Sequence, residues 1–180
     1  RQLYNKCRFV VYLQGITELE IYMIKLIASD LDGSLLNDNK QPPADLDDVL
    51  GSLKSKGITF AAVTGRNFDA TIPALGERAQ NMICICNNGA NIYEYGINTV
   101  NHPLTKEQVH RTLDAIKDMD NTIPLVFTLD RCYAVPGPAG FMEWAKAPYS
   151  PLDWFEDYNG LYTIEDDVYK ISVYDISDSN

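Results

Sequence analysis

The stretch from Ile24 to Ser34 joins an apolar run of strand length to two aspartates, Asp30 and Asp32, which flank one leucine and precede Gly33. Because the run is apolar on both faces, it predicts a central strand of a parallel sheet that helices cover on each side. In such sheets ligands bind beyond the carboxyl ends of the strands. The two carboxylates therefore lie where a ligand-binding or catalytic site is expected. The alternative is an acidic turn after a strand with no such role.

The same pattern recurs along the first half of the chain. Apolar segments 58–63 and 82–86 end in Thr64-Gly65-Arg66 and Asn87-Asn88-Gly89-Ala90. Helices are expected between these segments, over residues 46–53 with Gly57 just past the end, and over about 68–79 with Pro73 kinking the helix or delaying its start. Strands that alternate with helices predict an α/β fold with a doubly wound parallel sheet. The polar residues that follow each strand then lie at the same end of the sheet.

The pattern changes after residue 90. Short strands are expected at 91–95 and 99–101, a helix from the Thr105–Gln108 capping box to about Met119, a hairpin over 125–135, a short helix over 141–147 and a strand over 168–175. This mixture is α+β, so we expect a domain boundary near residues 97–103. The expected organisation is an extension over 1–22, a core over 23–100 and a second domain over 101–180.

Charge and cysteine content restrict the partners and the compartment. The net charge of −10 argues against nucleic acid or an anionic membrane as partner, and no apolar run is long enough for a transmembrane helix. An acidic protein that handles phosphate must build a local positive site, most simply with a metal ion. Cys84 and Cys86, one residue apart, lack the usual zinc spacing, so the cysteines are expected to pack in a reducing, cytoplasmic compartment.

Three motifs in this order resemble those of the haloacid dehalogenase (HAD) superfamily. They are Asp30-Leu31-Asp32-Gly33-Ser34-Leu35-Leu36, Val63-Thr64-Gly65-Arg66 and Asn88-Gly89-Ala90. Within the superfamily the order is similar to that of the Cof-type sugar-phosphate phosphatases, which carry a large α/β cap inserted after the third core strand. The resemblance covers residues 23 to about 103 closely and the cap region loosely. It implies an Mg²⁺-dependent phosphatase of small phosphorylated metabolites.

The resemblance implies that Asp30 is the nucleophile, that Asp32 is the general acid and base, and that both belong to the metal site. The physical chemistry agrees, because strand residues two apart point to the same side and both carboxylates can reach one substrate. Asp30 can attack phosphorus in line and form an aspartyl-phosphate. Asp32 can protonate the leaving alcohol and then take a proton from the water that cleaves the intermediate.

The same resemblance assigns substrate or phosphate binding to Thr64, Gly65, Arg66 and Asn88. Thr64 matches the residue that hydrogen-bonds the transferring phosphoryl group, and a hydroxyl that caps the following helix is an equal alternative. A solvated arginine and a turn asparagine are the alternatives for Arg66 and Asn88. The family more often has Thr at the position of Ser34, a change that keeps the hydroxyl.

Two family motifs that follow the cap, a lysine and Gly-Asp-x-x-Asn-Asp, have no match after residue 103. Lys170 lies in Val168-Tyr169-Lys170-Ile171-Ser172, which resembles a cap strand instead. The chain is therefore expected to be the amino-terminal part of such a phosphatase with an incomplete cap, and its first strand is then expected at a sheet edge. A non-catalytic module that binds phosphate or a partner through the same residues stays open as the alternative. The sequence indicates no particular oligomeric state.

Overall fold

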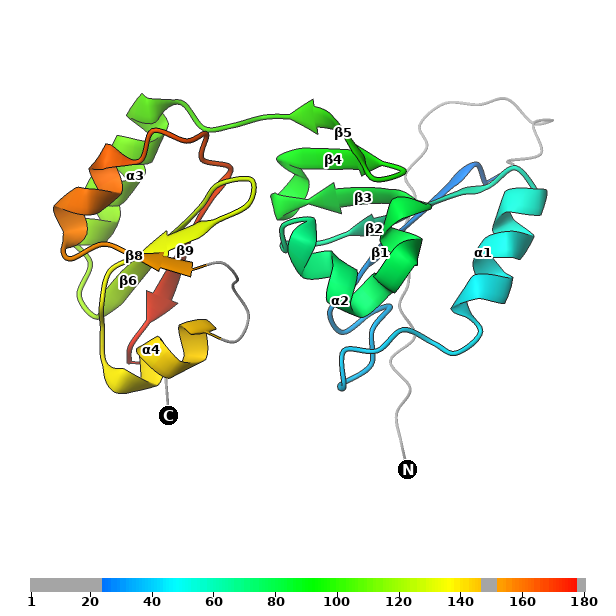
Figure 1. Ribbon diagram of the computed structural model, residues 1–180, viewed down its shortest axis with the longest axis horizontal. Helices are drawn as coiled ribbons and strands as arrows, with labels where there is room; N and C mark the ends of the chain where they lie inside the picture. The colour runs from blue at the N-terminus through cyan, green and yellow to red at the C-terminus, as the bar shows by residue number, and fades with distance from the viewer. Residues whose placement is uncertain (1–23, 147–151, 178–180) are drawn as a thin grey trace, which may run out of the picture.

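Two β-sheets lie side by side in the computed structural model, which describes residues 24–146 and 152–177 (Figure 1). The expected extension over residues 1–22 lies outside the described residues. The first sheet has the order β1-β2-β3-β4-β5. Its strands are β1 (Leu26–Asp30), β2 (Thr59–Val63), β3 (Ile83–Cys86), β4 (Asn91–Glu94) and β5 (Ile97–Asn101). The chain then passes to the second sheet through the connection from β5 to α3.

The first sheet confirms the predicted α/β fold. Strands β1, β2 and β3 pair in parallel, while β4 and β5 continue the same sheet in antiparallel pairs. The β4–β5 hairpin turns at Tyr95 and Gly96, which both have positive φ, the backbone conformation that a tight two-residue hairpin requires. The domain division near residues 97–103 stays a prediction, and the structure adds that β5 pairs within the first sheet as far as Asn101.

One of the two expected helices forms as predicted and the other is broken. Helix α1 (Leu46–Ser55) ends just before Gly57, whose φ of 67° suits the end of a helix. The segment expected as one helix over about 68–79 is instead three short pieces, η1 (Asp69–Thr71), α2 (Ile72–Leu75) and η2 (Gly76–Gln80). Pro73 lies in the first turn of α2 and Gly76 has a φ of 61°, so the α-helical hydrogen-bond pattern stops between α2 and η2.

Strand β1 is less buried than its apolar sequence predicts. It is an edge strand of the described sheet, and Leu26 is 55% exposed. Leu31, directly after the strand, is fully buried and anchors the segment in the core of the first sheet. The expectation of burial on both faces is therefore wrong for the part of the chain that the structure describes.

Cys84 and Cys86 lie on β3 and are both fully buried in this same core. Residues two apart in a strand share a face, so both thiols pack against the same apolar cluster. Burial raises the pKa of Cys84 to about 11 and that of Cys86 to about 12. Both side chains therefore stay protonated near neutral pH, which agrees with the predicted packing role.

The second sheet has the order β8-β7-β6-β9. Its strands are β6 (Thr122–Phe127), β7 (Cys132–Ala134), β8 (Leu152–Trp154) and β9 (Lys170–Asp175). Helices α3 (Lys106–Lys117), α4 (Ala139–Lys146) and η4 (Tyr158–Thr163) accompany them. The predicted hairpin forms between β6 and β7. Neither β8 nor η4 was predicted.

Strand β6 is the centre of the second sheet because both of its faces are covered. Its odd-numbered residues Ile123, Leu125 and Phe127 pack with residues of α4, while Val126 packs with α3 and η4. Alternating side chains thus contribute to two apolar clusters on opposite faces of one strand. Among the described residues, no helix combines the length and the apolar character needed to cross a membrane.

Helix α3 begins with the predicted capping box. The Thr105 hydroxyl accepts a hydrogen bond from the Gln108 amide at 3.2 Å, and the Gln108 side chain accepts one from the Thr105 amide at 2.8 Å. Each bond satisfies an amide that the first helical turn leaves unpaired.

We expect Thr105→Ala to lower the free energy of unfolding by about 1 kcal/mol, because the cap is lost. Thr112→Ala is the matched control, since the Thr112 hydroxyl donates to a carbonyl inside the same helix and alanine favours helix. Urea unfolding followed by circular dichroism measures both variants. Equal losses in the two variants would contradict the importance of the cap.

Candidate active site

The two aspartates lie where β1 ends. Asp30 is the last residue of β1 and Asp32 follows two positions later, and both are exposed while Leu31 between them is fully buried. The alternation that buries Leu31 turns both carboxylates to solvent. The chain then folds back at Gly33, whose φ is 78°, and the Leu35 amide donates to the Asp30 carbonyl at 3.1 Å.

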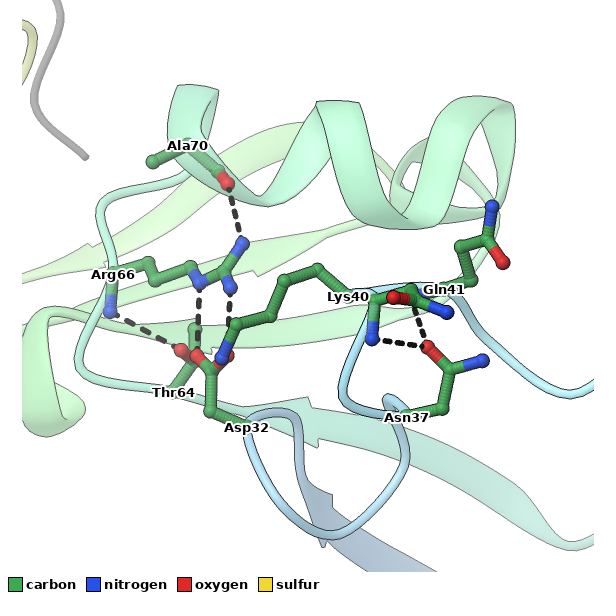
Figure 2. A network of polar contacts seen from close by, with 8 residues as sticks. Asp32, Asn37, Lys40, Gln41, Thr64, Arg66 and Ala70 are labelled. Carbon is green, nitrogen blue, oxygen red and sulfur yellow. Dashed lines mark hydrogen bonds and ion pairs between the residues drawn. The ribbon is translucent and has the colours of Figure 1, made fainter. Parts of the chain in front are cut away.

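Two cations hold the Asp32 carboxylate, as Figure 2 shows. Arg66 binds it with both arms of its guanidinium, at 2.9 Å from Nε to Oδ2 and 2.7 Å from Nη2 to Oδ1. Lys40 Nζ donates to Oδ1 at 2.8 Å. The hydrogen bonds from Arg66, followed by those from Lys40 and by the charges of both, hold the pKa of Asp32 below its ordinary value. Asp32 is therefore an ionised carboxylate near neutral pH.

Arg66 is fixed by contacts at both ends of its side chain. Its amide donates to the Thr64 hydroxyl at 3.1 Å, and its Nη1 donates to the Ala70 carbonyl at 3.2 Å. The guanidinium is thereby aimed from the end of β2 at the end of β1. In this structure the Arg66 guanidinium pairs with Asp32, and its contact with substrate stays a prediction.

Lys40 reaches the site from a loop that Asn37 organises. The Asn37 side-chain oxygen accepts hydrogen bonds from the amides of Asn39 and Gln41, each at 3.0 Å (Figure 2). The Lys40 amide donates to the Asn37 carbonyl at 2.9 Å. Lys40 has a φ of 59°, which such a turn imposes. Sequence reasoning missed Lys40, and the available signal was a lone cation in a turn-forming loop shortly after the aspartates.

The turns after β2 and β3 are bonded to each other. The Asn87 amide donates to the Arg66 carbonyl at 2.8 Å, and the Asn88 amide donates to the Thr64 carbonyl at 3.1 Å. A Cβ atom on Gly65 would lie 2.8 Å from Asn88 Oδ1, so this close approach requires glycine. The structure thus brings together Thr64, Gly65, Arg66 and Asn88, as the parallel strands predict.

Thr64 is 4% exposed and its hydroxyl oxygen accepts from the Arg66 amide. This bond closes a local turn at the end of β2 and does not cap the following helix η1, whose N-cap residue is Phe68. The contact of Thr64 with a phosphoryl group stays a prediction. The hydroxyl proton is not used by that bond, so the same side chain retains a donor.

The left-handed turn at Asn87 and Asn88 rests on a chain of amide side chains. Asn87 Nδ2 donates to Asn91 Oδ1, and Asn91 Nδ2 donates to Asn101 Oδ1, each at 2.8 Å. Asn87 and Asn91 are 3% and 0% exposed, so the bond between them is shielded from water. The chain of amides ties the turn after β3 to the β4–β5 hairpin, and sequence reasoning did not anticipate it.

The carboxylates of Asp30 and Asp32 are the kind of ligand that a magnesium ion binds. Mg²⁺ usually binds through one or two carboxylates together with water and substrate phosphate oxygens. In the described part of the chain no salt bridge involves Asp30, so its carboxylate is available, whereas that of Asp32 already faces two cations. Over residues 24–146 and 152–177 no three His, Cys, Asp or Glu side chains gather in an arrangement that could hold a metal ion.

The sequence model of the haloacid dehalogenase-like hydrolase family matches residues 27–178. The protein YxeH of Bacillus subtilis (strain 168), which carries a provisional phosphatase name, is 26% identical over 153 residues, which are 85% of this chain and 47% of YxeH. The chain therefore spans about half the length of this curated relative.

Two solved structures show the same fold. SMU.1108c of Streptococcus mutans UA159 superposes with a TM-score of 0.76 at 15% identity, over 84% of this chain and 57% of that one. The HAD subclass IIB sugar phosphatase BT4131 superposes with a TM-score of 0.65 at 17% identity, over 83% of this chain and 58% of that one.

We expect Arg66→Met to raise the pKa of Asp32 toward its ordinary value, because Arg66 is the largest cause of the depression. Lys40→Met should raise it less, since the Lys40 side chain is 61% exposed and that of Arg66 is 25% exposed. Carboxyl-carbon NMR titration of Asp32 measures both shifts.

A depressed carboxyl pKa stabilises the fold at neutral pH, and this stabilisation is lost as the pH falls through the folded-state pKa. The stability difference between the native chain and Arg66→Met should therefore shrink on acidification. A difference that grew in acid would contradict the ion pair.

Proposed function

Because the chain belongs to the haloacid dehalogenase-like hydrolase family, we propose that it acts in the Mg²⁺-dependent hydrolysis of phosphate monoesters of small metabolites such as sugar phosphates. The observation that carries the proposal is the pair of exposed carboxylates at the end of β1, one paired with two cations and one available. The phosphatase name of YxeH and the sugar-phosphatase activity named for BT4131 support the same reaction class.

Asp30 is the proposed nucleophile. One oxygen of its carboxylate forms a bond to phosphorus as the bond from phosphorus to the alcohol oxygen breaks, and the alcohol leaves with a proton. Water then attacks the aspartyl-phosphate, which releases inorganic phosphate and restores the carboxylate. Bound Mg²⁺ supplies charge neutralisation that lets a phosphate dianion approach an acidic chain.

Asp32 is the proposed general acid and base, and its cations determine when it can serve. While Arg66 and Lys40 hold it ionised, Asp32 can accept a proton from water but has none to give. A phosphate dianion that binds the same guanidinium and ammonium groups weakens their hold on Asp32. Its pKa then rises, and the carboxyl can carry the proton that the leaving alcohol needs.

The turns after β2 and β3 supply the proposed phosphate-binding groups, Thr64, Gly65, Arg66 and Asn88. The Thr64 hydroxyl proton and the Arg66 guanidinium are donors that suit phosphate oxygens. The proposed location is the cytoplasm, which the buried free cysteines of the described residues, Cys84, Cys86 and Cys132, support. With a net charge of −10, the proposed partner is a small phosphorylated metabolite and neither nucleic acid nor a membrane.

A non-catalytic phosphate-binding module is the second candidate. The observation that favours it is the pairing of the Asp32 carboxylate with two cations. A carboxylate that is held ionised in this way has no proton to donate, so it is a poor general acid. Such a module would bind phosphate without turnover.

The full-length gene product should release phosphate from p-nitrophenyl phosphate or a hexose phosphate with Mg²⁺, and should lose this activity in EDTA because the dianion is then repelled. Phosphate release is measured in EDTA and again after excess Mg²⁺ has been added back. Turnover that persists in EDTA would contradict the metal requirement. Phosphate binding without turnover would favour the non-catalytic module.

Asp30→Asn should abolish turnover in the same protein, because an amide cannot act as the nucleophile. Asp32→Asn should lower kcat by roughly two to four orders of magnitude, the range expected for a lost general acid–base group. Asp38→Asn is the matched control, because this exposed aspartate lies in the neighbouring loop and should keep the native rate. Native turnover by Asp30→Asn would place the nucleophile elsewhere.

A further inference from the structure

Lys170 connects the second sheet to the candidate active site. It is the first residue of β9, and its Nζ donates a hydrogen bond of 2.6 Å to the carbonyl oxygen of Gly65, 105 positions earlier in the chain. Gly65 lies between Thr64 and Arg66, in the turn that aims the guanidinium at Asp32. The contact thus joins a strand of one sheet to the turn that organises the site on the other.

The Lys170 ammonium is held firmly in this position. Lys170 pairs with Phe127 across β9 and β6, and its Nζ lies 3.9 Å from the centroid of the Phe127 ring. Phe127 is itself 2% exposed. A cation that is partly withdrawn from water over an aromatic face gains more from each remaining polar partner, so the Gly65 carbonyl is a strong acceptor for it. Burial also lowers the pKa of Lys170.

The Gly65 carbonyl is a sensitive point of the turn. Its peptide unit links Gly65 to Arg66, so its orientation sets the direction in which the Arg66 backbone leaves the turn. Asn88 packs against Gly65 and leaves no space for a side chain, which limits the other positions this peptide can take. A donor on the carbonyl therefore adds to the bonds made by the amides of Arg66, Asn87 and Asn88, which hold the same turn.

We propose that Lys170 is a positioning residue that docks the second sheet on the Thr64–Arg66 turn and so keeps Arg66 aligned on Asp32. When β9 moves away, the Gly65 carbonyl loses its charged donor and the turn loosens. In this way the second sheet influences Asp32 indirectly, through the contact of Lys170 with Gly65 and the neighbouring Arg66. The kinetic consequence rests on the proposed phosphatase function, whereas the docking itself does not.

Amide hydrogen exchange of the 180-residue chain tests the docking directly. In Lys170→Met, the peptides that contain residues 64–68 and 87–89 should exchange about tenfold faster, the scale of one lost hydrogen bond to a charged group. Lys170→Arg, which keeps a cationic donor, should restore part of the protection. Lys117→Met is the matched control, because Lys117 lies 5.8 Å from the Tyr158 ring centroid on the same half of the molecule and should leave both peptides unchanged.

Lys170→Gln is measured beside Lys170→Met, so that a folding failure of one variant leaves the other to decide. Native exchange of residues 64–68 in the folded variant would overturn the proposal. So would faster exchange spread equally over α3, since that result would mean general destabilisation instead of a released turn.

Kinetics of the full-length gene product separate this proposal from the proposed function. Lys170→Met should lower kcat about tenfold and change KM by less than about twofold, because a misaligned Arg66–Asp32 pair affects the chemical step more than ground-state binding. An unchanged kcat beside a native exchange pattern overturns the positioning role. If the native protein shows no phosphatase activity, the proposed function fails, and the exchange result still decides whether Lys170 docks the second sheet.

Discussion

The bidentate ion pair between Arg66 and Asp32 is the contact on which the arrangement of the site depends. It joins the end of β2 to the residues that follow β1, and it sets the ionisation state of Asp32. Thr64, Ala70 and the turn after β3 all act on Arg66, while Lys40 acts on the same carboxylate from the opposite loop. The surrounding turns therefore converge on one guanidinium and one carboxylate.

The convergence of these turns follows from the sequence because parallel strands end at one edge of a sheet. The aspartates at the end of β1, Thr64 after β2 and Asn88 after β3 could be placed together without any tertiary information. The α/β fold and the capping box of α3 were predictable for the same kind of reason, since each depends on local spacing. The roles of the site residues stay predictions, because sequence spacing locates a side chain but does not show its partner.

The features that the sequence did not reveal depend on partners far apart in the chain. Lys170 reads as an ordinary strand residue until its contact with Gly65, 105 positions away, is seen. Lys40 reads as a loop lysine, and its approach to Asp32 depends on the turn that Asn37 imposes. The broken helix between residues 69 and 80 has a more local cause, in which Gly76 overrides a helical pattern of apolar residues. The spacing of apolar residues alone does not show whether Gly76 ends the helix.

The charge of the chain gives these cations their significance. A protein with a net charge of −10 repels phosphate over most of its surface, so any phosphate site must be built from local positive charge. The sequence suggested a metal ion for this purpose. The structure adds Arg66 and Lys40 on Asp32, and Lys170 on the neighbouring carbonyl. Arg66 and Lys40 are already paired with the carboxylate of Asp32, so under the proposed function a phosphate dianion would gain them only by displacing that carboxylate. An acidic protein can in this way keep positive charge at one place while its own carboxylate neutralises that charge.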